Sequence, residues 1–159
     1  MFPAKRPRPM FAVRHTTTAL VWGAAGWQKP NFNTIDFDTT GSWDKIKYFY
    51  RPNVAGYYQF TGSYVIVVAG VLSATLLSTS IWKNGGNIGQ HNQTHDNAGG
   101  NINAGQSCTT ITTMNGTTDY VEAYVYSHKT YTDTGPYPAH DWFCGQFLGP
   151  YIPSIDNVS

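Results

Sequence analysis

Acidic residues are scarce in this sequence, and glutamate is nearly absent. Only 12% of the 159 residues are charged, and Glu122 is the one glutamate. Glycine, threonine, asparagine and aromatic residues are abundant instead, and these residues favour short strands and tight turns over helices. The composition therefore excludes a helical bundle and predicts a single all-β domain.

Long apolar runs are also lacking. The longest, Tyr64 to Leu72, is interrupted by glycine and is too short to cross a bilayer. The start, MFPAKRPRPM, has basic residues but no apolar stretch behind them, so we expect neither a secretory signal nor membrane insertion. We therefore expect the protein to be synthesised and assembled in a cytoplasm.

Cysteine occurs only at Cys108 and Cys144. Two isolated cysteines have no metal-ligand spacing, and a reducing compartment favours buried free thiols over a disulfide. Pairing of the two stays open at this point.

The first ten residues differ from the rest of the chain. They hold three prolines and the basic residues Lys5, Arg6 and Arg8, so residues 1–10 cannot form a helix or a central strand. We expect an extended docking arm, with a disordered tail as the alternative. Phosphate contacts would suit its charge, but no aromatic stacking platform accompanies it, so nucleic acid is not an expected partner.

The stretch from Tyr48 to Ile66 reads as a short aromatic strand, a turn and a long alternating strand. Because strand side chains alternate between faces, Tyr58 and Phe60 share a face that we assign to the core. The opposite face carries Tyr57, Gln59 and Ser63.

Further alternating segments follow the same pattern. We expect strands at Phe11–Thr16, Asn31–Asp38, Val71–Lys83, Ser107–Met114, Tyr120–Tyr126 and Trp142–Leu148. Asn84-Gly85-Gly86 and Asn115-Gly116 are hairpin signals, and a hairpin-like pair is also expected at Tyr48–Tyr50 and Gly56–Val68. Gly85–Gln106 reads as a long polar surface connection with room for one weak strand, and Ser127–Asp141 reads as a second polar loop. The strand spacing predicts an antiparallel double-sheet jelly-roll sandwich over residues 11–150, with a tail at 151–159.

Six short fragments in this order carry a family resemblance. They are FAVR at Phe11–Arg14, Pro52–Gly56, the Gly-x-Tyr-x-Phe of Gly56–Phe60, Lys83–Gly85, Asp119 with Val121, and the Phe-x-Gly-x-Phe-Leu of Phe143–Leu148. The chain thereby resembles the C1q-like and tumour-necrosis-factor-like jelly rolls, and its Asn-Gly-Thr-rich turns are similar to those of C1q-like domains in bacteriophage virion proteins. The chain departs from the animal family in having no collagen-like stalk.

The resemblance implies a homotrimer with one sheet of each subunit around the three-fold axis. Tyr57, Gln59 and Ser63 would then form the trimer interface, with Phe143 and Phe147 joining Tyr58 and Phe60 in the core. Fold alone does not set function.

Catalytic residues are not apparent. The acids are scattered, and both cysteines lie in predicted strands where a thiol is usually buried. His91, His95 and Asp96 have a spacing that could suit a metal, but a solvated loop is the favoured interpretation, so neither a metal nor a cofactor is expected.

These observations predict a non-enzymatic virion protein: a homotrimeric capsid decoration or head knob, docked through its arm onto the major capsid or another virion protein. The alternatives are a tail or fibre receptor-binding head and a free lectin-like module. In either alternative, the two polar loops would bind a host receptor or glycan. The candidate contact residues there are His91, His95, His128, Tyr131 and Tyr137.

Overall fold

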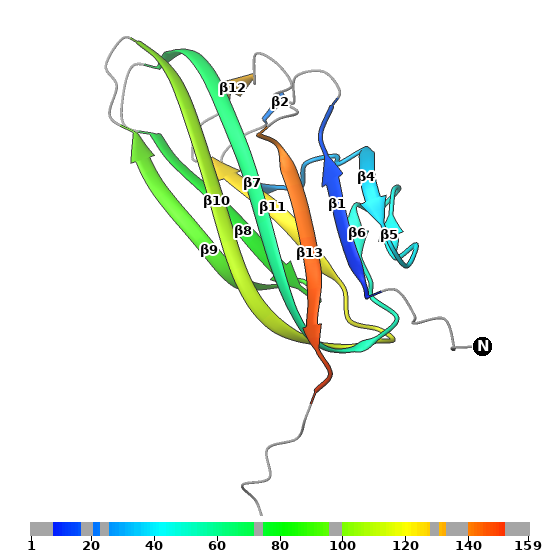
Figure 1. Cartoon of the computed structure of the whole chain (residues 1–159). Coiled ribbons are helices and arrows are strands. Elements are labelled where there is room, and N and C mark those ends of the chain that lie inside the picture. The colour runs from blue at the N-terminus through cyan, green and yellow to red at the C-terminus, as the bar shows by residue number, and fades with distance from the viewer. Residues whose placement is uncertain are drawn as a thin grey trace, which may run out of the picture.

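The computed structural model describes residues 8–16, 21–22, 26–71, 75–95, 100–127, 131–132 and 140–151. At 21–22, 66–71, 75, 95, 100–104 and 131–132 the description is limited to the backbone. The described chain is all-β, as predicted, and forms an antiparallel sandwich (Figure 1). None of its described elements is a helix that could cross a membrane.

Thirteen strands make up the described fold. They are β1 (Met10–Arg14), β2 (Val21–Trp22), β3 (Gly26–Gln28), β4 (Thr34–Asp38), β5 (Trp43–Asp44), β6 (Phe49–Tyr50), β7 (Ala55–Val71), β8 (Thr75–Lys83), β9 (Gly86–His95), β10 (Gly100–Asn115), β11 (Val121–Ser127), β12 (Tyr131–Thr132) and β13 (Trp142–Gly149).

Two sheets form the layers. The five-stranded sheet has the order β10-β7-β13-β1-β4, and the six-stranded sheet has the order β5-β6-β11-β8-β9 with β3 added to β11. The short strands β2 and β12 pair separately. In Figure 1 the five-stranded sheet lies in front of the six-stranded one.

Aromatic side chains fill the space between the sheets. Phe11 stacks on Tyr50 with ring centroids 4.1 Å apart and meets Phe143 edge-on at 5.1 Å. Gly145 makes this packing possible, because a Cβ there would lie 2.5 Å from the Phe60 ring. The predicted core residues Tyr58, Phe60 and Phe143 are fully buried, and Phe147 is partly buried against them. The core assignment is therefore confirmed.

The prediction that Gly85–Gln106 is mainly a surface connection was wrong. It contains β9 and the first half of β10, which pair with β8 and β7 respectively. Its glycine, asparagine and glutamine residues have low strand propensity, but propensity is a weak guide where neighbouring strands supply the pairing. Tyr131–Thr132, inside the second predicted loop, is likewise a strand.

Two of the three predicted hairpins were also wrong. The Asn84–Gly86 turn does join β8 to β9, with positive φ angles of 52° at Asn84 and 80° at Gly85, as expected for a tight hairpin. The Asn115-Gly116 turn instead joins β10 of one sheet to β11 of the other. The chain after β6 crosses between sheets in the same way to reach β7.

Candidate functional site

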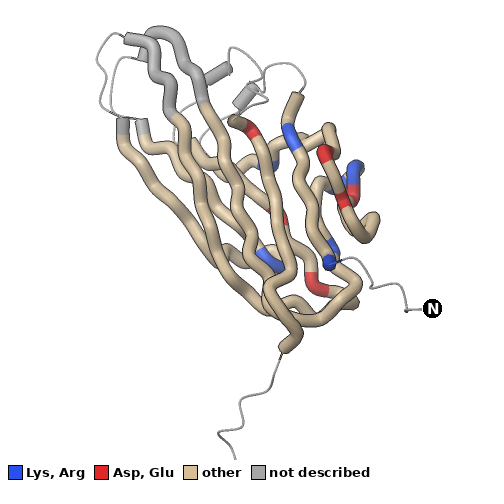
Figure 2. Tube along the Cα trace, viewed as in Figure 1, with Lys and Arg blue, Asp and Glu red and all other residues tan. Residues whose placement is uncertain are grey.

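Three adjacent strands of the five-stranded sheet carry no ionisable Asp, Glu, Lys, Arg or His. They are β10, β7 and β13, which lie side by side in that order. In Figure 2 the parts of these three strands that are not grey are tan throughout, whereas blue or red segments lie on β1, β4 and the strands behind. The outer surface of these three strands, called the uncharged face below, is the most distinctive surface of the described molecule.

Strand register sets the rows of the uncharged face. Gln59 of β7 lies between Ile111 of β10 and Gln146 of β13, and Gln146 Nε2 donates to Gln59 Oε1 at 3.3 Å. Thr61 lies between Thr109 and Cys144, with 2.9 Å between the two threonine hydroxyl oxygens.

The third row consists of Ser63 between Ser107 and Trp142. Apart from Trp142, small hydroxyl and amide groups thus cover the middle of the uncharged face, and two pairs of them bond each other within it.

Large apolar side chains surround these rows. Ile111 is 60% exposed, Leu148 44% and Tyr151 56%. A hollow of about 200 Å³ lies at the β1 side, lined in part by Met10, Phe37 and Cys144. Exposed apolar groups on a surface without charge are typical of a surface that another protein covers.

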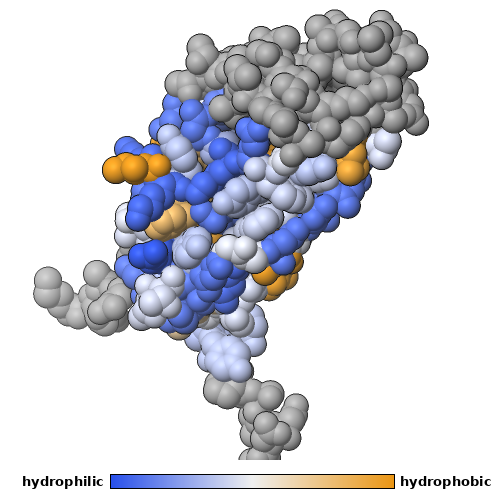
Figure 3. Space-filling model, turned by 180° about the vertical axis from the view of Figure 1, so that it is seen from behind, coloured by the Kyte–Doolittle hydropathy of each residue, from blue (hydrophilic) through white to orange (hydrophobic). Residues whose placement is uncertain are grey.

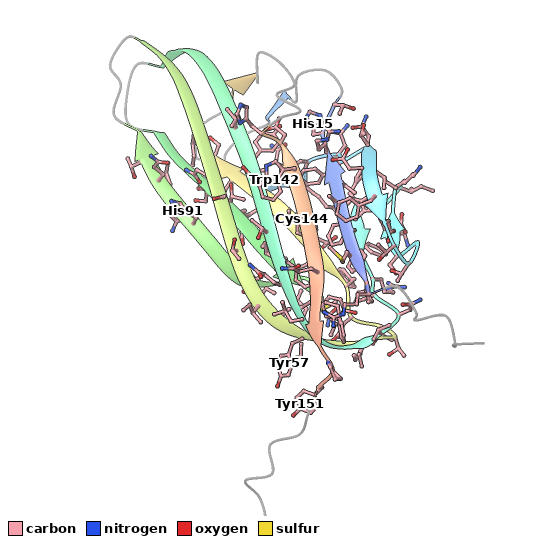
Figure 4. The ribbon with its side chains drawn as sticks, viewed as in Figure 1. His15, Tyr57, His91, Trp142, Cys144 and Tyr151 are labelled. Carbon is pink, nitrogen blue, oxygen red and sulfur yellow. The ribbon has the colours of Figure 1, made fainter. Side chains whose placement is uncertain are left out.

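The residues predicted for the trimer interface all lie on the uncharged face. Tyr57, Gln59 and Ser63 point outward from β7, while Tyr58, Phe60 and Tyr64 point inward. Tyr57 is 37% exposed, and its ring centroid lies 5.8 Å from that of Tyr151. Figure 4 shows this pair together near the start of β7 and just past the end of β13.

The other predicted binding residues are dispersed or lie outside the described part. His91 is exposed on β9, far from His15 and from Tyr57 (Figure 4). The side chains of His95 and Tyr131, and all of His128 and Tyr137, lie outside the described residues. Among the described side chains, no group of three His, Cys, Asp or Glu could hold a metal.

Only the last part of the predicted arm is described. Lys5 and Arg6 lie outside the described residues, and Arg8 is exposed. Residues 8–10 are held on the sandwich: Thr39 Oγ1 donates to the Arg8 carbonyl at 2.7 Å, and Phe147 N donates to the Pro9 carbonyl at 2.9 Å.

Sequence reasoning missed a buried polar pair, His15 and Asp141. Both side chains have zero exposure, and His15 Nδ1 lies 3.8 Å from Asp141 Oδ2. Val65 N donates to Asp141 Oδ1 at 2.8 Å, and His15 N donates to the Asp141 carbonyl at 3.0 Å. Alternation could have revealed the histidine, since Phe11, Val13 and His15 share the inward face. Asp141, directly before β13, therefore bonds β7 through its carboxylate and His15, after β1, through its backbone carbonyl, and its burial indicates a structural role.

The two cysteines are free and lie on opposite faces of one sheet. Cys108 is opposite Gly62 and faces the core, whereas Cys144 is opposite Thr61 and faces outward. Burial raises the pKa of both thiols above the ordinary 9.0. A disulfide between them would have to cross the sheet.

No protein-family model matches the chain, and neither does any curated protein.

Proposed function

We propose that this chain is a non-enzymatic structural protein of a virus particle that works as a homotrimer, with the uncharged faces of three subunits around the three-fold axis. The observation that carries the proposal is that the adjacent strands β7, β10 and β13, which have 41 residues when both faces are counted, contain no ionisable Asp, Glu, Lys, Arg or His. Interface centres are depleted in charge and enriched in aromatic residues, and a solvated sheet face has no reason to exclude charge over three strands.

The order of the strands supports the finer jelly-roll topology on which the proposal rests. The chain passes from β7 to the other sheet for β8 and β9, returns for β10, leaves for β11 and returns for β13. The first and last strands of the sandwich, β1 and β13, are neighbours. Such repeated crossing between layers is typical of a jelly roll and not of a meander.

The particle role rests on symmetry and on the arm. A trimer matches the three-fold positions of a capsid, and three arms that engage together add avidity. The segment before Arg8 is basic and rich in proline, and it serves as the docking arm of the knob. An acidic surface of a capsid protein is the partner that this arm would fit.

Placing a charge at the centre of the uncharged face tests the trimer. Thr61 has neighbours on both sides and no large side chain of its own, so Thr61→Lys should keep the fold and bury three like charges near one axis. We expect a trimer for the wild type and a monomer for Thr61→Lys by light scattering after gel filtration, with unchanged circular dichroism. Tyr57→Lys should act in the same direction.

Gln90→Lys supplies the matched control, because Gln90 is exposed on β9 of the other sheet. It should leave the trimer intact. A wild-type protein that is monomeric at tens of micromolar, or a Thr61→Lys protein that remains trimeric, would contradict the proposed interface.

The docking role is tested by removing residues 1–7 and keeping Arg8–Met10, which the sheet holds. The truncated protein should remain a trimer but fail to enter particles in an assembly reaction with the capsid components. Normal incorporation of the truncated trimer would remove the arm from the proposal and leave the trimer standing.

A further inference from the structure

The six-stranded sheet has a gap at one edge of β11. On one side β8 pairs along the whole strand, but on the other side β6 pairs only at Val121 and β3 only from Val125 onward. Lys29, after β3, and the turn before β6 fill part of this gap.

A hollow of about 480 Å³ remains there, within the usual size of small-molecule sites. Its lining residues are Lys29, Ile46, Lys47, Tyr48, Phe49, Arg51, Tyr120 and Glu122.

The hollow is positively charged. Three cations and one carboxylate line it, and one cation is already matched, since Lys29 Nζ donates to Glu122 Oε1 at 2.5 Å and to the Lys47 carbonyl at 2.6 Å. Among the described residues, no carboxylate lies within 4.0 Å of the charged group of Lys47 or Arg51. Asp44 interacts electrostatically with both at longer range, but no ion pair occupies the donors of these two cations.

Arg51 is held in position by aromatic rings. Its guanidinium carbon lies 4.9 Å from the centre of the Phe49 ring and 5.9 Å from that of Tyr120, and its backbone N–H donates to the Ser42 carbonyl at 3.0 Å. Stacking uses the face of a guanidinium and leaves the N–H donors at its edge free. A planar donor fixed in this way matches a carboxylate in two-bonded geometry.

The turn that precedes Arg51 contains a residue with an unusual backbone conformation. Tyr48 has a φ of 52°, a left-handed conformation uncommon for a residue with a side chain. The turn enforces it: Tyr48 N donates to the Asp44 carbonyl at 2.8 Å, and Asp44 Oδ1 accepts from the N–H groups of Ile46 and Lys47, each at 2.8 Å. Strained backbone held by its surroundings is frequent at ligand sites. Here it places Ile46, 86% exposed, at the rim of the hollow.

We infer that this hollow binds a carboxylated sugar, such as a uronic acid unit of a polysaccharide. Arg51 pairs with the sugar carboxylate and Lys47 adds a second positive charge. The Tyr120 hydroxyl bonds a sugar hydroxyl, and Ile46 contacts the apolar face of the ring. Lys29 already neutralises Glu122, and Asp44 interacts electrostatically with both Lys47 and Arg51. The three cations therefore leave one uncompensated positive charge, which a monocarboxylate matches better than a dianionic phosphate.

The site is independent of the proposed trimer. It lies on the sheet opposite the uncharged face, on the largely hydrophilic side of the molecule that Figure 3 shows. A monomeric Thr61→Lys protein should therefore bind the sugar as the wild type does, so the two proposals can fail separately.

Titration of the full chain with methyl glucuronide, followed by NMR chemical-shift changes, tests the inference. We expect saturable binding of the glucuronide and about tenfold weaker binding of methyl glucoside, its neutral analogue, because one charge-assisted pair is worth about 1.4 kcal/mol or more. Equal binding of the two sugars would overturn the proposal, and so would equal or tighter binding of inorganic phosphate.

Arg51→Met is the decisive variant, because methionine keeps apolar contact with Phe49 and Tyr120 but removes the donors. It should lose about tenfold in glucuronide affinity, and Arg51→Lys should lose part of it, since an ammonium cannot make the two-bonded contact. Arg14→Ala, which removes a cation paired with Asp36 on the other sheet, is the control and should bind normally. Unchanged affinity in a folded Arg51→Met protein would refute the assigned site.

Discussion

The five-stranded and six-stranded sheets share one core but turn different chemistry outward. The five-stranded sheet exposes Ile111 and Leu148 among hydroxyl and amide groups. The six-stranded sheet covers its outward aromatic residues with each other: Trp27 lies 5.3 Å from Tyr126, and Trp82 lies 4.7 Å from Tyr124, between ring centroids. It adds charge through pairs such as Lys29 with Glu122.

The two sheets therefore differ in whether their outward apolar side chains are covered by other side chains of the same subunit or remain exposed. On the six-stranded sheet, contacts between aromatic rings cover apolar surface within one subunit, and ion pairs neutralise charge there. The hollow beside Arg51, where we propose a ligand site, lies on this sheet. An uncharged face with separate apolar side chains gains most from being covered by protein. The two proposals accordingly use different sheets, the five-stranded sheet for assembly and the six-stranded sheet for ligand binding.

The largest expected effect comes from breaking the core that the sheets share. Phe143 is fully buried and its ring contacts those of Phe11, Trp43 and Phe60. Phe143→Ala should lower the free energy of unfolding by about 3–5 kcal/mol, from lost burial and the cavity left behind. Urea denaturation, with fluorescence and circular dichroism as parallel probes, measures this.

Phe37→Ala is the control for that loss, because Phe37 is 46% exposed on the outer side. Its effect should stay below about 1 kcal/mol. Similar losses from both substitutions would mean that the sandwich has no single shared core.

A smaller effect is expected at the crossing from β10 to β11. Burial opposes ionisation of Asp119, but bonds from Asn84 Nδ2 at 2.8 Å, Lys83 Nζ at 3.0 Å and Asn115 N at 2.9 Å outweigh it and lower its pKa below the ordinary 3.8. A lowered pKa means that the contribution to stability is present above pH 4 and is lost as the pH falls through the folded value.

Asp119→Asn should therefore destabilise the protein by about 1 kcal/mol at neutral pH and flatten the fall in stability below pH 4. Denaturation curves from pH 7 to pH 2.5 measure both effects. Thr117→Ala, an exposed change in the same turn, should leave the acid limb as steep as in the wild type. An equally steep limb in Asp119→Asn would place the acid sensitivity elsewhere.

The smallest effect is one of thiol reactivity. Both thiols should alkylate slowly at pH 8 and faster as the pH rises, because burial raises their pKa and the thiolate is the reactive form. Cys144, on the outer side, should react before Cys108, which is 6% exposed. Mass spectrometry after timed iodoacetamide treatment separates the two.

Cys144 also reports on the uncharged face. It lies opposite Thr61, so it should react faster in the Thr61→Lys monomer than in the wild-type trimer, while Cys108 keeps its rate. Equal Cys144 rates in both proteins would argue that no subunit covers this face.

Local pattern was sufficient for much of this fold. The alternation of Tyr57 to Tyr64 correctly divided core from surface, and Asn84-Gly85 correctly marked a hairpin, because side-chain direction and turn geometry depend on neighbours along the chain. Composition alone excluded helices. For the candidate surface, the residues proposed for the interface could be assigned to one face of β7, although the strands beside them could not be identified.

The sheet to which each strand belongs was decided only by the tertiary structure. Asn115-Gly116 has the sequence of a hairpin but crosses between layers, and the polar segment of β9 is a strand because β8 pairs with it. Pairing is a long-range choice that local sequence does not encode. The same holds for both surfaces to which a function is proposed. Three uncharged strands become one face only when β7 lies between β10 and β13. Arg51 and Lys47 border a hollow only because β3 and β6 leave β11 uncovered between them.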